Sequence, residues 1–263
     1  MALDVTSAVD VAAVEAAIGG LYGGPLPEAS GVLHVVAVAP EVDDLRVIRI
    51  NEEAPKSPTD FFLLNLTRAR VDGIVVTGAI LRDEADLTYD LQGPGRSSEG
   101  LSAYRRAVAR RAGPPLLLIL TRGHHLPEDH PAYHSWAEPV VFTSERAVPP
   151  LRRTLPARVD VVGDPSPSLA SALAYLERRR ACRAVSVEAG PSVAADLYRS
   201  GGAPSVDELL LSEFEGQLAP GARGRLLGTR SAVLGPLTPA GGPTAVEEDS
   251  GPWRFSRHVR RAP

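Results

Sequence analysis

The 263-residue chain contains a single cysteine, Cys182, and a single lysine, Lys56. One cysteine cannot form an intrachain disulfide, which excludes a secreted, disulfide-stapled scaffold. At the start of an apolar strand, such a cysteine is more often a small core residue than a reactive thiol. Because lysine is so scarce, nearly all positive charge is arginine, and we attribute this bias to genome composition rather than to a binding role.

The sequence also lacks a long apolar run and a large net charge. No stretch is long enough to span a bilayer, and the N-terminus has no basic region followed by an apolar run. The formal net charge of −4 gives no general reason to expect nucleic acid or an anionic membrane as a partner. With 44% hydrophobic and 23% charged residues, the chain can bury a sizeable core. We therefore expect a cytoplasmic globular protein that acts on a small molecule.

Short apolar runs alternate with helical patterns along most of the chain. The predicted strands are 32–39, 45–50, 74–77, 116–121, 139–143, 159–162, 184–188, 206–214 and 253–259, and the predicted helices lie within 5–19, 58–71, 101–112, 168–179 and 191–199. This alternation is typical of an α/β fold with a largely parallel sheet. The last two strands have no predicted helix between them, so we expect them to be antiparallel, with 253–259 at the edge of the sheet.

The expected organisation is an N-terminal helix and connection over 1–31, followed by one three-layer α/β/α domain over 32–263. No internal repeat or low-complexity linker requires a second domain. The segment 219–252 is dense in glycine and proline, and no strand or helix is predicted in it.

The segment Val185–Tyr198 is predicted to be a strand, a glycine turn and the start of a helix. Such a turn leaves backbone N–H groups unpaired, and together with the positive end of the helix they form an anion site. Gly190 would let a phosphate approach the backbone, and Pro191 suits the first helical position. We interpret the segment as a site for a phosphorylated cofactor. A plain turn without a ligand is the alternative, because one Gly-Pro step is not a fingerprint.

Two further strands end in comparable turns, one at Thr77–Glu84 and one at Thr121–Gly123. Open α/β sheets bind ligands at the carboxyl ends of their strands. Arg122 could grip a phosphate through its fork of N–H donors, as the 2′-phosphate of NADPH would require. No turn has the G-x-G-x-x-G pattern, so an ordinary Rossmann site is not indicated, and a simple loop remains the alternative for each.

Four histidines follow the second of these turns, at 124, 125, 130 and 134. Their side chains could in principle hold a metal ion. Pro127 and Pro131 interrupt the segment, and no helix aligns the imidazoles. We therefore favour a solvated loop and expect no metal.

Taken in order, these segments resemble the C-terminal reductase domain of the bacterial bifunctional riboflavin-biosynthesis deaminase/reductase. The matching pieces are Ser57-x-x-Asp60, Leu66-x-Arg68-Ala69, Val71-Asp72-Gly73-Ile74, Val76–Glu84, Leu120-Thr121-Arg122, Leu126-Pro127-x-Asp129-His130-Pro131, Phe142-Thr143, Val187-Glu188-Ala189-Gly190-Pro191 and Val206-Asp207-Glu208-Leu209. The resemblance implies a dihydrofolate-reductase-like mixed sheet, mostly parallel with an antiparallel C-terminal edge, and a homodimer. It also implies NADPH-dependent reduction of the ribosyl group of an aminopyrimidine phosphate. We expect no deaminase domain, because the zinc signature H-x-E with P-C-x-x-C has no counterpart.

Carried over by position, the resemblance implies three cofactor-binding segments and a substrate site. NADPH would contact Thr77, Gly78, Ala79 and Ile80, then Thr121 and Arg122, and then Ala189, Gly190, Pro191 and Ser192. The substrate would lie near Ser57, Asp60 and Glu188, with Glu188 and Asp60 as the catalytic residues.

Three departures from the family pattern leave the function open. The family's Ser-Leu-Asp-Gly after the first strand is absent, so its acid would have to come from Glu41, Asp43 or Asp44. Ile80 replaces a hydroxyl side chain, and Ala189 replaces a glycine. One alternative is a non-catalytic nucleotide-binding protein of the same fold. Another is a reductase of a secondary-metabolite pathway that uses the same cofactor.

Overall fold

The computed structural model describes residues 4–123, 125–199 and 206–261. Its helices are α1 (Val11–Tyr22), α2 (Pro58–Arg70), α3 (Gly78–Asp83), α4 (Ser97–Ala107), α5 (Val148–Thr154), α6 (Leu169–Arg180), α7 (Pro191–Ala194) and α8 (Arg230–Leu234). Its strands are β1 (Gly31–Glu41), β2 (Asp44–Ile48), β3 (Gly73–Thr77), β4 (Leu116–Leu120), β5 (Glu138–Ser144), β6 (Asp160–Asp164), β7 (Ala184–Val187), β8 (Glu208–Phe214), β9 (Arg223–Thr229), β10 (Leu237–Pro239), β11 (Thr244–Glu248) and β12 (Gly251–Arg260). Short 3-10 turns are η1 (Val5–Ser7), η2 (Pro131–Tyr133), η3 (Glu145–Ala147), η4 (Ala195–Tyr198) and η5 (Pro220–Ala222).

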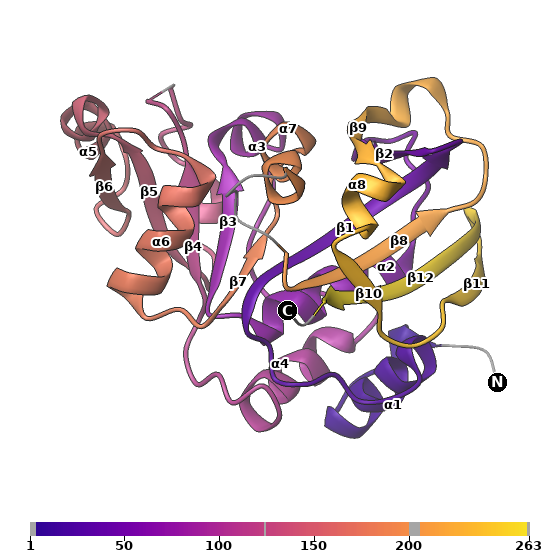
Figure 1. The fold of residues 1–263 in the computed structure, drawn as a ribbon. Helices are drawn as coiled ribbons and strands as arrows, with labels where there is room; N and C mark the ends of the chain where they lie inside the picture. The colour runs from indigo at the N-terminus through magenta and orange to yellow at the C-terminus, as the bar shows by residue number, and fades with distance from the viewer. Residues whose placement is uncertain (1–3, 124, 200–205, 262–263) are drawn as a thin grey trace.

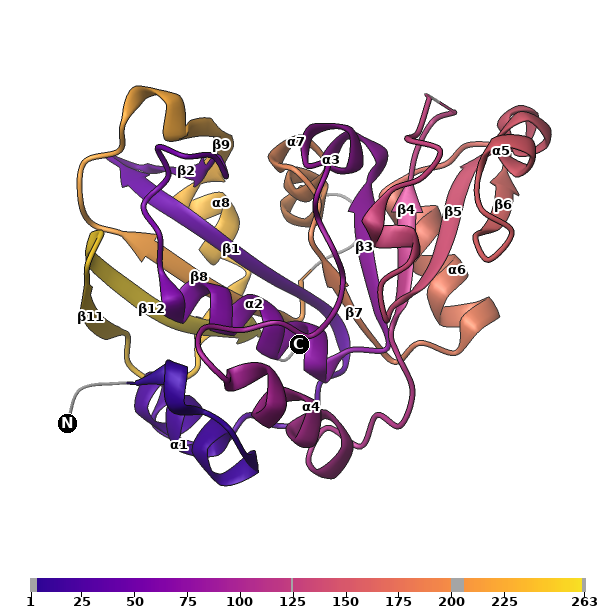
Figure 2. The same ribbon diagram turned by 180° about the vertical axis from the view of Figure 1, so that it is seen from behind.

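One sheet crosses the molecule in the strand order β10-β12-β8-β1-β7-β3-β4-β5-β6 (Figures 1 and 2). From β8 to β6 every neighbouring pair is parallel, whereas β12 is antiparallel to β8 and to both β10 and β11. The structure therefore confirms the mostly parallel mixed sheet with an antiparallel C-terminal side. The first strand of the chain lies between β7 and β8, which come from its last third.

Helices cover both faces of the sheet, which gives the expected three layers (Figures 1 and 2). Alternate residues of β1 point to opposite faces. Ala39 packs into a core with residues of α1, α2 and α4, whereas Val38 packs into a core with residues of α6 and α8. A third core lies between β3, β4 and β5 and the segments before and after β5, and includes Ile74 and Ile119.

Helix α2 is fixed at both of its ends. The Ser57 hydroxyl accepts a hydrogen bond from the Asp60 N–H, and Pro58 occupies the first turn, so the helix begins where the sequence predicts. At the other end, the Arg105 guanidinium donates to the carbonyls of Arg68, Ala69 and Val71. These contacts satisfy carbonyl groups that the helix itself leaves unpaired.

The C-terminal quarter contains elements that the sequence analysis does not assign, and one strand is placed differently from the prediction. The glycine-rich segment 219–252 forms β9, α8, β10 and β11. Strand β12 is not an edge strand, since it pairs with β8 on one side and with β10 and β11 on the other. Its alternating arginines indicated an exposed edge, but they pair with acids at the ends of β8: Arg257 lies 2.6 Å from Glu208, and Arg260 lies 3.2 Å from Asp207.

Helix α1 contributes Val14, Ile18 and Leu21 to the core that it shares with α2 and α4. The expected boundary between 1–31 and 32–263 stays a prediction. Within the described ranges, no helix combines the length and the apolar character needed to cross a membrane.

Candidate functional site

The three predicted cofactor segments meet at one edge of the sheet. Val75 on β3 pairs with Val187 on β7, and Thr77 at the end of β3 pairs with Leu120 at the end of β4. The turns that follow β7, β3 and β4 therefore lie side by side, with α7 next to α3 (Figures 1 and 2). A Cβ added to Gly78 would lie 2.7 Å from Leu126 Cδ2 and 3.3 Å from the Cβ of Thr121, so the turn after β3 packs directly on the segment after β4.

The turns after β3 and β7 both open short helices. Helix α3 has six residues, and α7 has four residues before it continues as η4, so the predicted helix over 191–199 is only partly α-helical. Neither helix has a side-chain cap, because Thr77 forms no capping hydrogen bond and Gly190 has no side chain. Within the described chain, the N–H groups of both first turns therefore have no side-chain acceptor. Such groups can bind an anion.

The backbone of the turn after β7 is not strained at Ala189 or at Gly190. Gly190 has a φ of −58°, and no atom lies within 4 Å of a Cβ added there. Ala189 is not among the described residues with positive φ. Alanine at this position therefore causes no backbone strain, and the space above Gly190 is open to a ligand.

Thr121 and Arg122 differ in their surroundings. Thr121 is buried, and its N–H donates to the carbonyl of Phe142 on β5 at 3.0 Å. Arg122 is exposed, and no hydrogen bond or ion pair joins it to another residue of the described ranges. Its guanidinium is therefore available to an anionic ligand at this edge.

The central strand β1 is uncovered beside these turns. Along one edge it pairs with β8 from Leu33 to Val38. Along the opposite edge it pairs with β7 as far as His34 and with β2 only from Val38 onward. Within the described ranges, no strand covers that edge at 35–37, and all three of these residues are partly exposed. The bare edge lies between the end of β7 and the arm formed by β2 and β9, and we call it the β1 gap.

Glu188, the first residue after β7, is held in a buried ion pair. Its carboxylate accepts two hydrogen bonds from Arg68 Nε, at 3.1 Å each, and one from Arg68 Nη2 at 2.7 Å. The two side chains are only 5% and 7% exposed, and the Arg68 guanidinium lies 4.7 Å from the ring centroid of Tyr89. Burial alone would lower the pKa of Arg68, but the carboxylate of Glu188 raises it above its usual value. Arg68 therefore stays protonated, and the ion pair joins the C-terminal end of α2 to the end of β7.

Asp60 lies in the first turn of the same helix and faces β8. Burial raises the pKa of Asp60 to about 6, and the nearby Glu248 carboxylate adds a smaller increase. The Ser212 side chain lowers the pKa, but by less than burial raises it. Glu248 Oε1 accepts a hydrogen bond of 3.1 Å from the N–H of Thr59. Ser57, which caps the helix through the N–H of Asp60, lies beside the same carboxyl group.

The two predicted catalytic residues lie near opposite ends of α2: Asp60 belongs to its first turn, and Glu188 contacts Arg68 in its last turn. The helical rise places the backbone of Asp60 about 12 Å from that of Arg68, the partner of Glu188. Ser212, which Asp60 faces, pairs with Ala37, whereas Glu188 directly follows Val187, which pairs with His34. Along β1, Glu188 therefore lies near the start of the segment 35–37 and Asp60 near its end.

The acids after the first strand lie on the far arm. Glu41 forms ion pairs with Arg46 at 2.7 Å and with Arg223 at 3.3 Å. Asp43 and Asp44 belong to the turn between β1 and β2 and to the start of β2.

Three residues of this region have no place in the site that the sequence predicts. Arg68 and Tyr89 hold Glu188, and Arg225 on β9 donates a hydrogen bond of 3.0 Å to the Ser192 hydroxyl. Arg68 stands 120 positions from Glu188, so no local pattern could pair them. Arg225 lies on β9, in a segment to which the sequence analysis assigns no element.

Comparison with solved structures identifies proteins of the same fold. A pyrimidine reductase-like protein from Corynebacterium diphtheriae matches with a TM-score of 0.64 and 19% identity, over 90% of this chain and 96% of that one. The diaminohydroxyphosphoribosylaminopyrimidine deaminase/5-amino-6-(5-phosphoribosylamino)uracil reductase of Thermotoga maritima matches with a TM-score of 0.56 and 17% identity. The alignment covers 89% of this chain but only 57% of the Thermotoga protein. The riboflavin biosynthesis reductase of Saccharomyces cerevisiae matches with a TM-score of 0.50 and 15% identity, over 92% of this chain and 97% of that one.

No protein-family model and no curated protein sequence matches the chain. At identities below 20%, the structural likeness establishes a shared architecture. The chain therefore has the fold of these reductases, which confirms the dihydrofolate-reductase-like fold that the sequence resemblance implied.

Proposed function

We propose that this protein is an NADPH-dependent reductase that acts on a pyrimidine ribosyl phosphate or a related heterocycle. The observation that carries the proposal is the convergence of three ligand-binding turns on one sheet edge, next to the β1 gap. Ligands of open α/β sheets occupy this position, outside the carboxyl ends of the strands. The shared fold with riboflavin-pathway reductases supports the same reaction class.

The residues at this edge fit a dinucleotide phosphate. The uncapped N–H groups after β3 and β7 and the unpaired guanidinium of Arg122 supply donors for phosphate oxygens. The segments that would hold the cofactor are Thr77–Ile80, Thr121–Arg122 and Ala189–Ser192. When bound, NADPH would supply the hydride.

The chain's own part in the reaction is to orient the substrate and to move one proton. Reduction of a carbonyl group requires a proton at oxygen in addition to the hydride. Asp60 suits this transfer, because a carboxyl group with a pKa of about 6 is both protonated and ionised near neutral pH. Glu188 is engaged by Arg68, so we assign it to substrate binding through its remaining lone pairs. Ser57 fixes the turn of α2 that holds Asp60.

Titration of the purified protein with NADPH and NADH, followed by fluorescence, tests the cofactor assignment. Replacing Arg122 with alanine should weaken NADPH binding at least about tenfold, which corresponds to one lost charge-assisted hydrogen bond. NADH binding should change little, because NADH lacks the 2′-phosphate. Arg106→Ala is the matched control, since Arg106 is an exposed arginine of α4. Equal losses for the two cofactors, or no NADPH binding by the unaltered protein, would refute the assignment.

A non-catalytic nucleotide-binding protein is the second candidate. Ile80 offers no hydroxyl to a phosphate, and Glu41 is engaged by two arginines. Single-turnover measurements with NADPH and pyrimidine ribosyl phosphates separate the candidates. Oxidation of NADPH supports the reductase, and tight binding without oxidation across a panel of heterocycles supports the second candidate.

A further inference from the structure

A polar depression lies at the opposite edge of the sheet, where the parallel strands begin. Its volume is about 410 Å³, and its walls come from the segment after α4, the end of α6 and the residues before β7. Five arginines line it: Arg105, Arg110, Arg111, Arg180 and Arg183. The lining includes only two acids, Asp72 and Glu138, so positive charge is in excess.

Three of the five arginines form ion pairs with acids. Arg111 lies 3.1 Å from Asp72, whose carboxylate also accepts hydrogen bonds from the N–H groups of residues 183 and 184. Arg180 lies 3.5 Å from Asp160, outside the depression. Arg183 lies 3.1 Å from Glu28. Both members of this last pair are more than half exposed, so the contact is weak and easily exchanged for another anion.

The two remaining arginines form no ion pair within the described chain. Arg105 donates its hydrogen bonds to backbone carbonyls. Burial lowers the pKa of Arg105 to about 10; the charge of Asp72 opposes this shift and the neighbouring Arg111 adds to it, so Arg105 is still protonated at neutral pH. Arg110 is exposed and forms no hydrogen bond or ion pair with another described residue. The depression therefore combines a fixed positive floor with arginines free to contact a ligand.

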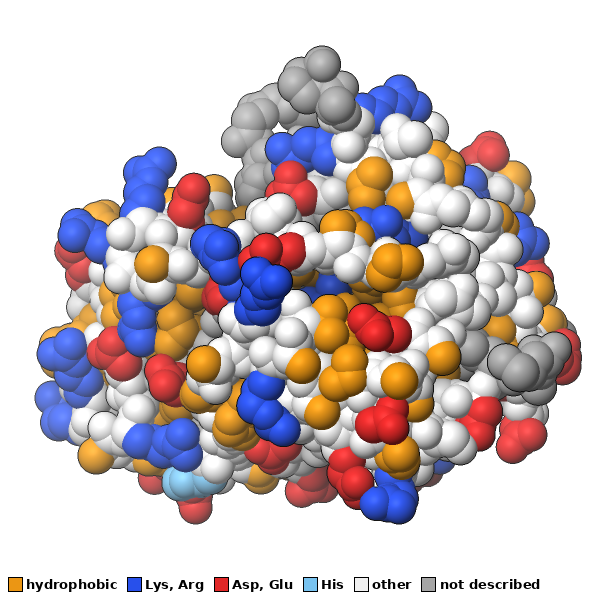
Figure 3. All heavy atoms as spheres, turned by 90° about the horizontal axis from the view of Figure 1, so that it is seen from below, with side chains coloured by type: hydrophobic (Ala, Val, Ile, Leu, Met, Phe, Trp, Pro, Cys, Tyr) orange, Lys and Arg blue, Asp and Glu red, His pale blue; other side chains and the backbone are white. Residues whose placement is uncertain are grey.

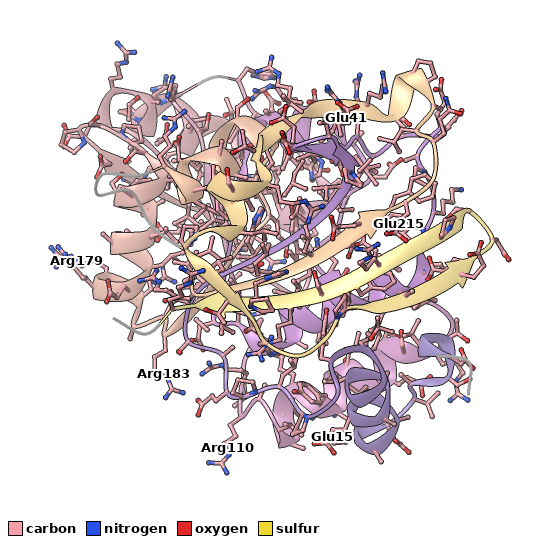
Figure 4. All side chains as sticks on the ribbon, turned by 45° about the vertical axis from the view of Figure 1, so that its right-hand side comes forward. Glu15, Glu41, Arg110, Arg179, Arg183 and Glu215 are labelled. Carbon is pink, nitrogen blue, oxygen red and sulfur yellow. The ribbon has the colours of Figure 1, made fainter. Side chains whose placement is uncertain are left out.

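Two of these arginines can be followed in Figure 4. Arg110 and Arg183 project outward from the same end of the molecule, and Arg179 points away to another side. Seen from below, Lys and Arg side chains are spread over the molecule with acidic ones between them (Figure 3). Arg110 and Arg183 are therefore both accessible from solvent at this end of the molecule.

We propose that this depression is a second ligand site, which binds a small polyanion with two or more phosphate groups. Its volume is that of a small-molecule site, and arginines on separate segments suit a ligand with several anionic groups. It is distinct from the proposed cofactor site. Strands β3 and β7 begin at the depression and end at the cofactor turns, and five residues of extended chain span about 15 Å.

Isothermal titration with inorganic pyrophosphate, at low ionic strength and in a phosphate-free buffer, tests the proposal. We expect binding to the unaltered protein. The double variant Arg110→Gln/Arg183→Gln should weaken it at least about tenfold, the effect of one lost charge-assisted hydrogen bond. Both positions are exposed, so the variant should fold, and its far-UV circular dichroism and urea midpoint should match those of the unaltered protein.

Two matched variants distinguish binding at this depression from non-specific attraction of pyrophosphate to surface arginines and from binding at the proposed cofactor site. Arg179→Gln removes an exposed arginine of α6 outside the depression, and Arg122→Gln alters the proposed cofactor site. Retained pyrophosphate binding in both variants, together with loss in the double variant, supports the second site. The proposal is overturned by absence of binding to the unaltered protein, by an equal loss in Arg179→Gln, or by loss in Arg122→Gln while the double variant still binds.

Discussion

Replacing Glu188 with alanine should destabilise the protein strongly, because the change leaves a charged guanidinium without its partner. Arg68 is 5% exposed, donates three hydrogen-bond contacts to the Glu188 carboxylate and stacks on Tyr89. No water shell can replace the carboxylate at such a position without opening the contact between α2 and β7. The loss therefore reflects the cost of an unpaired buried charge more than the net stability of the pair.

The expected loss of unfolding free energy is about 3 kcal/mol, at the lower end of the range for breaking a buried pair. We choose the lower end because Glu188, taken as a whole residue, is only partly buried. For a chain of this size, the loss corresponds to a fall of roughly 6 to 12 °C in Tm. Glu188→Gln should cost less, about 1 to 2 kcal/mol, because its amide oxygen still accepts a hydrogen bond from Arg68.

Urea unfolding followed by circular dichroism measures these losses, and a double-mutant cycle isolates the pair. Arg68→Met combined with Glu188→Met places two apolar side chains of suitable volume at the contact. The double variant should be more stable than Glu188→Ala, and the coupling energy of the cycle should exceed about 2 kcal/mol. NADPH affinity measured on the same variants shows whether the cofactor turn after β7 keeps its shape.

A loss below about 1 kcal/mol for Glu188→Ala would show that solvent screens the pair, as it does for exposed ion pairs. Additive effects of the two methionine substitutions would show the same. Either result would refute the view that this contact holds α2 against β7.

Three further changes test other parts of the site. The stability of the unaltered protein should fall between pH 4 and pH 7, and Asp60→Asn should abolish this fall. The folded-state pKa of Asp60, about 6, lies above the unfolded value of 3.8, so in this window the folded chain holds a proton that the unfolded chain has lost. The free energy of unfolding therefore decreases as the pH rises. The upper limit of this fall is about 3 kcal/mol, and the actual fall should be smaller because Asp60 keeps some contact with solvent. Urea unfolding at pH 4 and pH 7 measures it. An identical fall in the asparagine variant would contradict the assignment. Gly78→Val should lower the unfolding free energy by about 1 to 3 kcal/mol and weaken NADPH binding, because the added Cβ lies 2.7 Å from a Leu126 methyl group. Gly190→Ala, the control, should change the unfolding free energy by less than about 0.5 kcal/mol. Equal effects of the two changes would contradict this packing. Ser57→Ala should lose about 1 kcal/mol through the missing N-cap, and Ser57→Asp should restore it; failure of the aspartate to restore stability would exclude the cap as the cause.

The central part of the fold could be predicted because its signals are local. Ser57-Pro58 marks the start of α2, and buried β-branched runs mark β1, β3 and β7. Since parallel strands end at the same edge, the three turns could also be expected to lie together. The β2–β9 arm gave no such signal: β9 follows a glycine- and proline-rich segment, and most of its residues are exposed or partly exposed, so its apolar pattern is weak.

The contacts that hold the candidate site could not be predicted, because they join distant positions. Arg68 and Glu188 stand on α2 and after β7, and only the packed sheet brings them together. The raised pKa of Asp60 has the same origin, since burial against β8 and the approach of Glu248 from β11 cause it. The segment that would place an acid after the first strand became a hairpin, and its Glu41 pairs with arginines of the arm instead.

The position of β1 between β7 and β8 has a consequence for synthesis on the ribosome. Only its last residues pair with a near neighbour, at β2, while its first eight wait for strands from the last third of the chain. The Asp207 carboxylate that receives the N–H of Val32 is 175 positions away. By contrast, β3 to β6 form a contiguous run that can pair as it emerges. We therefore expect the β3–β6 half to fold first, and β1, an apolar strand with two open edges, to depend on chaperone protection until β8 has left the ribosome.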